Sequence, residues 1–190
     1  MKKIFKYMLL FLSVIIFLNC VDEKKKLEQA KRLKSEFFNA CKKSDIKKIK
    51  ELLKKGIDIN IQDNDNPKCL AYAARNGNVE LVKFLIIQGA DIRYLGNIEE
   101  SLLNTAAKHG RLKLVKYIIS NKIMTVNEKT KGRYALGVAA SWNRFKIVKY
   151  LISQGVKNIS SALPSAAYDG NFKILKYLIL KGAKLDNKYS

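Results

Sequence analysis

The chain has 190 residues, of which 48% are hydrophobic, and its 37 Lys and Arg against 16 Asp and Glu give a formal net charge of +21. This length leaves room for one domain, and the apolar content can build a core if the elements pack together. The charge makes a polyanion a possible partner. However, Lys far outnumbers Arg and Asn and Ile are frequent, so we favour a compositional bias toward AT-rich codons.

The first 20 residues are typical of an export signal. Lys2, Lys3 and Lys6 precede an apolar run at 7–18, which is too short to span a membrane easily. Phe17-Leu18-Asn19-Cys20 resembles a bacterial lipobox, in which the cysteine thiol is diacylated and becomes the new amino terminus. We therefore predict a signal peptide at 1–19, lipidation of Cys20, and export with anchoring to a bacterial cell membrane, on its periplasmic or surface face. An ordinary secretory peptide and a retained amino-terminal anchor are the alternatives.

Residues 20–34 follow as a lipidated cysteine, a charged spacer and the start of a capping helix. The spacer runs from Val21 to Lys26, and apolar residues then recur every three or four positions from Leu27 to Lys43. We expect the extra turns of this helix to cover the end of the domain that follows.

Two landmarks recur through the rest of the chain at one interval. Both follow steps of 33, 33, 33 and 27 residues. The first landmark is a pair at Ser44-Asp45, Gly77-Asn78, Gly110-Arg111, Asn143-Arg144 and Gly170-Asn171, and the second is a single residue at Gly56, Gly89, Lys122, Gly155 and Gly182. The chain is therefore an array of five units, the last of which begins six residues early.

Each unit carries two helical patterns. A pair of small residues marks the first, as at Ala73-Ala74, and an apolar stripe marks the second, as at Leu81, Val82 and Leu85. Small side chains let stacked helices approach closely, and one unit cannot bury its apolar face alone. We expect neighbouring units to stack into a continuous core.

This array resembles the ankyrin repeat family over 35–190. The resemblance implies an all-α solenoid of about five helix-turn-helix units with short hairpin fingers between them. The units are expected at about 35–67, 68–100, 101–133, 134–160 and 161–190. The family's Thr-Pro-Leu-His opening keeps only its apolar third position here, as in Lys68-Cys69-Leu70-Ala71. Fingers are expected at 61–68, 93–100 and 127–133, whereas the connection at 157–160 is too short for a full one.

No enzyme or metal-site signature is present in the sequence. His109 has no second His or Cys at ligand spacing, and no phosphate loop or nucleophile elbow occurs. His109 is expected to be an exposed surface residue. The run beginning at Asp63 resembles the start of a calcium loop but lacks the closing Glu, so a finger tip is the better interpretation. We predict no enzyme activity, cofactor or metal.

Cys41 and Cys69 are predicted to be free, buried core residues. Export would permit a disulfide. However, stacked helices lie about 8–10 Å apart, and a five-residue offset adds roughly 7 Å along the axis. This separation exceeds the roughly 7 Å between Cα atoms that a disulfide allows.

In ankyrin-like proteins the concave face, built from first helices and fingers, selects the partner. The matching positions in this chain are Asn39, Lys42 and Lys43; Tyr72, Arg75 and Asn76; Thr105, Lys108 and His109; Val138, Ser141 and Trp142; and Ser165, Tyr168 and Asp169. We predict that the partner contacts Tyr72, Arg75, Lys108, His109, Trp142 and Tyr168, because Tyr, Trp and Arg dominate interface energetics. Packing of Trp142 onto a neighbouring unit is an equally weighted alternative.

The function predicted is a membrane-tethered, non-catalytic scaffold that binds a protein partner and is itself a monomer. Binding of nucleic acid or another polyanion through the basic surface is the alternative, although export disfavours nucleic acid as a partner. A secreted soluble binding module, an enzyme with dispersed residues and a purely structural protein are further possibilities.

Overall fold

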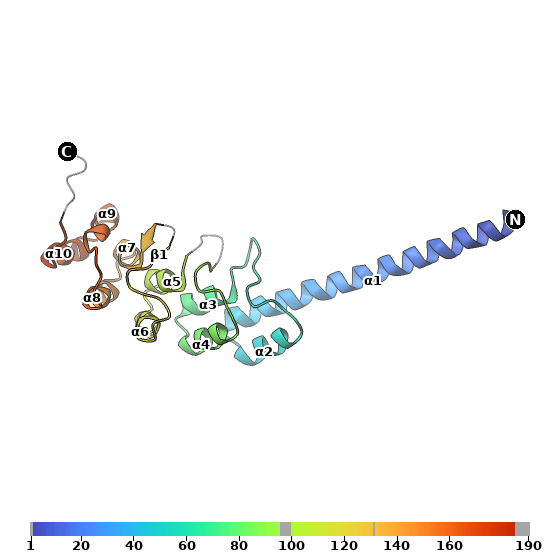
Figure 1. Cartoon of the computed structure of the whole chain (residues 1–190), viewed down its shortest axis with the longest axis horizontal. Helices are drawn as coiled ribbons and strands as arrows, with labels where there is room; N and C mark the ends of the chain where they lie inside the picture. The colour runs from blue at the N-terminus through green and yellow to red at the C-terminus, as the bar shows by residue number, and fades with distance from the viewer. Residues whose placement is uncertain (1, 96–99, 131, 185–190) are drawn as a thin grey trace.

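The computed structural model describes residues 2–95, 100–130 and 132–184, and for residues 2–20 it describes the backbone only. Five helix pairs follow one another along the molecule (Figure 1). The first helices are α1 (Lys2–Lys43), α3 (Cys69–Asn76), α5 (Leu102–Lys108), α7 (Ala135–Ser141) and α9 (Leu163–Tyr168). The second helices are α2 (Ile46–Lys54), α4 (Val79–Ile87), α6 (Leu112–Ser120), α8 (Phe145–Ser153) and α10 (Phe172–Leu180). The predicted all-α solenoid of five units is confirmed.

The two sequence landmarks are the turns that end each helix. Gly77 and Gly110 adopt φ values of 73° and 72° between first and second helices, and Asn143 adopts 53° at the same place. Left-handed backbone favours Gly and tolerates Asn, which explains the residue types found. The next residue begins the second helix: the Asn78 side chain accepts a hydrogen bond from the Leu81 N–H at 3.0 Å.

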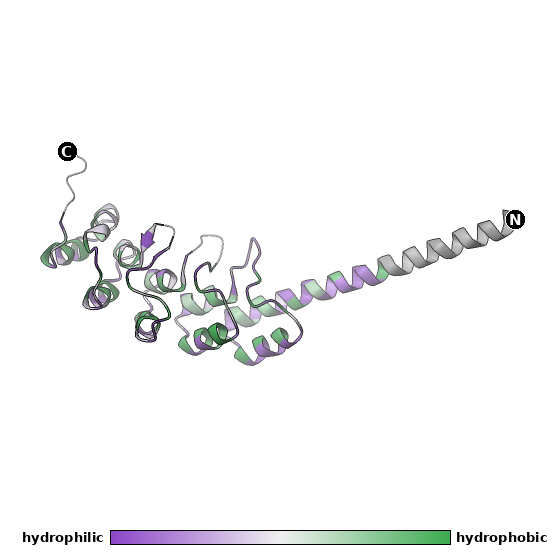
Figure 2. Cartoon of the chain, in the orientation of Figure 1, coloured by the Kyte–Doolittle hydropathy of each residue, from purple (hydrophilic) through white to green (hydrophobic). Residues whose placement is uncertain are grey.

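Neighbouring units bury one continuous core. Leu81, Val82 and Leu85 of α4 are fully buried, as are the equivalent residues of α6 and α8. The small pairs Ala73-Ala74, Ala106-Ala107 and Ala139-Ala140 are also completely buried. Small side chains at these positions allow the first helices to pack closely on one another. Figure 2 shows apolar and polar positions alternating along the helices of the stack, whereas the part of α1 that follows Val21 is mostly hydrophilic.

The fingers extend from the side of the first helices. Lys129–Thr130 (β1) pairs antiparallel with Arg133–Tyr134 (β2) to form the third finger. The first two fingers contact each other, because the Lys68 N–H donates to the Leu95 carbonyl at 3.2 Å. At the first finger the Asp63 carboxylate accepts from the Asn66 N–H at 2.8 Å, which closes a turn.

The connection between the fourth and fifth units is cut down, as its length predicts. A single 3-10 turn, η1 (Ser160–Ala162), leads directly into α9. The Ser161 N–H donates to the Asn158 side chain at 3.1 Å, and the Ser161 hydroxyl donates to the Asn158 carbonyl at 2.7 Å. Pro164 lies in the first turn of α9, where its missing N–H removes no helical bond.

The amino-terminal segment differs from the prediction in two ways. The charged spacer at 21–26 is helical, since α1 continues through it without a break. Residues 22–32 are exposed and lead away from the stack, so they do not cover its end (Figure 1). Burial begins at Phe37, which has an exposed fraction of 0%. Within the described ranges, no helix combines the length and the apolar character needed to cross a membrane.

The prediction of two free cysteines was wrong. Cys41 and Cys69 form a disulfide, and their Cα atoms lie 5.2 Å apart. The predicted separation was that between helix axes. Cα atoms lie about 2.3 Å off each axis, so two Cα atoms that face one another across the contact are closer together than the axes are. The prediction also assumed that α1 and α3 pack side by side as the later first helices do. Instead, α1 runs along the long axis of the molecule (Figure 1). The disulfide joins the end of α1 to the start of α3.

Candidate functional site

The six predicted contact residues all lie on first helices or directly after them. Tyr72 and Arg75 belong to α3, Lys108 and His109 end α5, Trp142 ends α7 and Tyr168 ends α9. Figure 1 shows α3, α5, α7 and α9 on the side of the fingers, with α4, α6 and α8 on the opposite side. We call these six residues the first-helix strip. Nothing in their placement tests binding, which stays a prediction.

Exposure varies along the first-helix strip. Tyr168 is 92% exposed and Trp142 is 49% exposed, and Arg75 is also exposed. Tyr72 is half-buried, and its hydroxyl donates to the Asn66 side chain at 3.1 Å. Two further positions expected on this face, Thr105 and Val138, are instead buried, with exposed fractions of 3% and 6%. Little of either side chain is therefore exposed, although Val138 still lines the groove described below.

Trp142 is held in place by a charged neighbour. The Lys108 ammonium lies 5.1 Å from the centre of the Trp142 ring, and the same ammonium is 3.0 Å from a Glu100 carboxylate oxygen. A cation over an indole face is favourable, and the Glu100 carboxylate fixes the Lys108 head. Trp142 therefore packs on the preceding unit and keeps half of its surface exposed. The packing alternative is thus seen in part, and binding of a partner by the exposed half of Trp142 stays a prediction.

His109 is half-buried, whereas an exposed surface residue was expected. Partial burial lowers the pKa of His109 below its usual range, and the positive charges of Arg75, Lys108 and Arg111 lower it further. The carboxylate of Glu100 opposes this effect. A neutral imidazole is therefore favoured within a basic part of the first-helix strip.

Side chains at the start of the second helices form hydrogen bonds to the carboxy-terminal ends of the first helices that carry the first-helix strip. Arg111 Nε donates to the carbonyl of Arg75 at 2.6 Å, and Arg144 Nε donates to the carbonyl of Lys108 at 2.8 Å. In the last unit the side-chain amide of Asn171 donates a hydrogen bond to the carbonyl of Ser141 at 2.8 Å. These bonds satisfy carbonyls that the end of a helix leaves without partners. The sequence marked these positions as landmarks but did not reveal this role.

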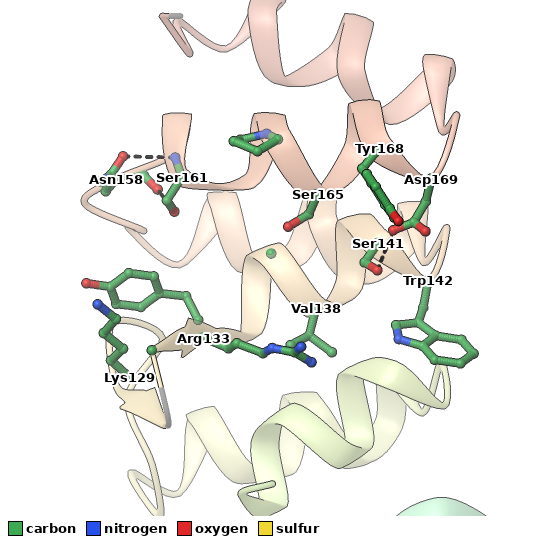
Figure 3. Close-up of a pocket in the computed structure, with 14 residues that line it drawn as sticks. Lys129, Arg133, Val138, Ser141, Trp142, Asn158, Ser161, Ser165, Tyr168 and Asp169 are labelled. Atoms are coloured by element: carbon green, nitrogen blue, oxygen red, sulfur yellow. Dashed lines mark hydrogen bonds between the residues drawn. The ribbon is translucent and has the colours of Figure 1, made fainter. Parts of the chain in front are cut away.

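A groove of about 780 Å³ lies at the carboxy-terminal end of the strip (Figure 3). Its floor is α7, one wall is α9 and one end is the third finger. The residues that line it include Lys129, Arg133, Gly137, Ser165, Trp142 and Asp169. The Ser141 hydroxyl donates to the Asp169 carboxylate at 2.6 Å across the groove. The groove brings Trp142 and Tyr168 together with finger residues that the sequence had not placed beside them.

Across residues 2–95, 100–130 and 132–184, no three His, Cys, Asp or Glu side chains gather as metal ligands would. What the strip offers is aromatic surface, cationic side chains and hydroxyls on a prebuilt face, which are the features of a recognition surface.

A family model described as "Ankyrin repeats (3 copies)" matches the chain in four overlapping windows, at residues 16–95, 37–129, 70–161 and 103–189. No curated protein matches the chain.

Proposed function

Because the chain belongs to the ankyrin repeat family, whose members are protein–protein interaction modules, we propose that it is a membrane-tethered, non-catalytic scaffold in the bacterial cell envelope. It acts as a monomer whose first-helix strip binds a protein partner. The strip is already formed before binding, which reduces the entropy lost on association.

The exposure of Trp142 and Tyr168 carries the proposal. Large aromatic side chains are usually buried in a folded protein, but these two are 49% and 92% exposed on the same side of neighbouring first helices. Aromatic residues on a rigid surface are the usual anchors of protein interfaces. The adjacent charge of Lys108, paired with Glu100, adds a polar edge to this apolar surface.

Two features support export and tethering. The Cys41–Cys69 disulfide suits an oxidising compartment outside the cytosol. The helix between Cys20 and the first buried residue, Phe37, is about 25 Å long at 1.5 Å per residue, and most of its length is exposed. With lipid on Cys20, this helix would act as a stalk that holds the repeats away from the membrane surface.

The proposal is tested by affinity capture from detergent-solubilised cells of the natural host. The full chain is compared with a Trp142→Ala/Tyr168→Ala variant and with Phe172→Ala. Phe172 is a matched control, because it is also aromatic and 76% exposed but lies on α10, a second helix. We expect the double variant to lose the captured protein and Phe172→Ala to keep it, with helix content unchanged in both. Equal capture by all three proteins would contradict the proposal.

A further inference from the structure

The shortened connection leaves one side of the third finger uncovered. Earlier in the chain a finger is covered by the next one, as the hydrogen bond from Lys68 to Leu95 shows. After the third finger, η1 takes the place of a fourth, and the groove opens between β2 and α9 (Figure 3). The six residues missing from the array have therefore created a hollow that is flanked by the exposed residues Trp142 and Tyr168.

The finger end of this groove is cationic. Lys129 and Arg133 both line it and both are exposed. Neither Lys129 nor Arg133 belongs to any of the ion pairs found among the described residues. The Lys129 ammonium lies 5.7 Å from the centre of the Tyr134 ring, which keeps it beside the groove. A guanidinium that pairs with no carboxylate of the described residues is suited to bind one from another molecule.

The opposite end of the groove has a different chemistry. Trp142 and Tyr168 supply aromatic surface there, and Asp169 supplies a negative charge held by Ser141. A nucleic acid strand would bring phosphates past Asp169, and among the described residues that line the groove it would find only two cations. A lipid surface would require a flat face and not a hollow. The distribution of charge favours a peptide that is acidic at one end only.

We propose that the groove binds an extended peptide segment of the protein partner, with a carboxylate on the Arg133 guanidinium and an apolar side chain against Trp142. This inference rests on the proposed function and names the class of segment that the scaffold recognises. From Tyr134 to Trp142 the helix rises about 12 Å, which an extended peptide covers in about four residues. The recognised segment is therefore an Asp or Glu with a large apolar residue three or four positions away.

The floor of the groove leaves room for the peptide backbone. Gly137 lines it from α7 and has no side chain, and Ser165 lines it from α9 (Figure 3). A Cβ atom added at Gly137 would lie 3.6 Å from the Ser165 hydroxyl, an ordinary contact. Alanine therefore fits at this position, whereas a longer side chain must extend into the groove.

The test uses the fluorescence of Trp142, the single tryptophan of the chain. The detergent-solubilised full chain is titrated with a blocked Ser/Gly peptide that carries one Glu and, four residues on, one Leu. We expect a saturable change in emission, and replacing Glu by Gln in the peptide should weaken binding about tenfold. Arg133→Glu should weaken the Glu peptide similarly, whereas Lys146→Glu, an exposed cation on α8, should leave binding unchanged.

A second pair of variants tests the place of binding without changing charge. Gly137→Met should abolish the emission change and Gly137→Ala should retain it, with helix content unchanged in both. The inference would be overturned if binding were unchanged by replacing the peptide's Glu, by Arg133→Glu and by Gly137→Met. So would stronger binding of single-stranded DNA or anionic vesicles at the same residues. If capture of the partner depends on Trp142 but not on Arg133 or Gly137, the groove inference fails and the proposed scaffold function stands.

Discussion

Arg144 reaches back to Lys108, where its Nε donates a hydrogen bond to the main-chain carbonyl at 2.8 Å. Arg111 and Arg75 have the same relationship, as do Asn171 and Ser141. Each of these side chains begins a second helix and completes the end of the first helix in the preceding unit. The strip that carries Trp142 is thus stabilised by residues at the turn into the next second helix.

Replacing Arg144 should therefore destabilise the whole array. A hydrogen bond from a charged donor contributes about 1.5–3 kcal/mol, and partial exposure places this one near the lower end. We expect Arg144→Ala to lower the free energy of unfolding by about 1.5 kcal/mol, measured by urea denaturation. Arg144→Lys should restore little, because an ammonium lacks the planar fork. Lys146→Ala is the control, and an Arg144→Ala midpoint equal to that control would refute the role.

Reduction of the disulfide should destabilise the amino-terminal units. Cys41 and Cys69 are both fully buried and 28 residues apart in sequence. Loss of such a link typically costs about 2–4 kcal/mol. We expect reductant to lower the urea midpoint of the natural chain and to leave a Cys41→Ala/Cys69→Ala variant unaffected. A natural chain whose midpoint is insensitive to reductant, after thiol assay confirms reduction, would contradict this prediction.

Acidification should weaken the fold through His109. Its pKa is lowered in the folded protein, so the unfolded chain binds a proton more readily. Stability is then complete above the ordinary histidine pKa and falls as the pH drops through that value toward the lower folded pKa. We expect His109→Asn to reduce the loss of thermal midpoint between neutral and mildly acidic pH. The same pH dependence in the variant would exclude this histidine as its source.

Acylation should depend on Cys20 alone. Metabolic labelling with an alkyne fatty acid should mark the natural chain and leave Cys20→Ser unlabelled, whereas Cys41→Ala/Cys69→Ala should retain the label. A lipid on the thiol requires that cysteine, and the other two are joined in a buried disulfide. Label that persists in Cys20→Ser, or that never appears in the natural chain, would refute lipid anchoring and favour a conventional or retained leader.

The repeated parts of the fold could be predicted from the sequence because every unit carries the same pattern of residues. The spacing of Gly77, Gly110 and Asn143 located the turns, and the alanine pairs located the packed helix faces. Even the cut-down connection before Pro164 followed from a count of residues. Periodicity averages out local uncertainty, since an error in one unit is corrected by the others.

The parts predicted poorly are those without a repeat. Helix α1 has no preceding unit to fix its direction, so neither its straight course through Val21–Lys26 nor the contact of Cys41 with Cys69 could be derived from spacing. The Lys108–Trp142 contact and the groove beside Arg133 depend on side-chain positions across units. Repeat spacing specifies which residues share a face, but it does not specify where the ends of long side chains from neighbouring units make contact.

Recognition by the first-helix strip is tested most directly by photo-cross-linking in living cells. A photoreactive amino acid is placed at position 142 in one strain and at position 172 in another. We predict that position 142 traps one defined protein and that position 172 does not, although it is the more exposed of the two (76% against 49%), because it lies on a second helix. The same products from both positions, or none from position 142, would contradict the account.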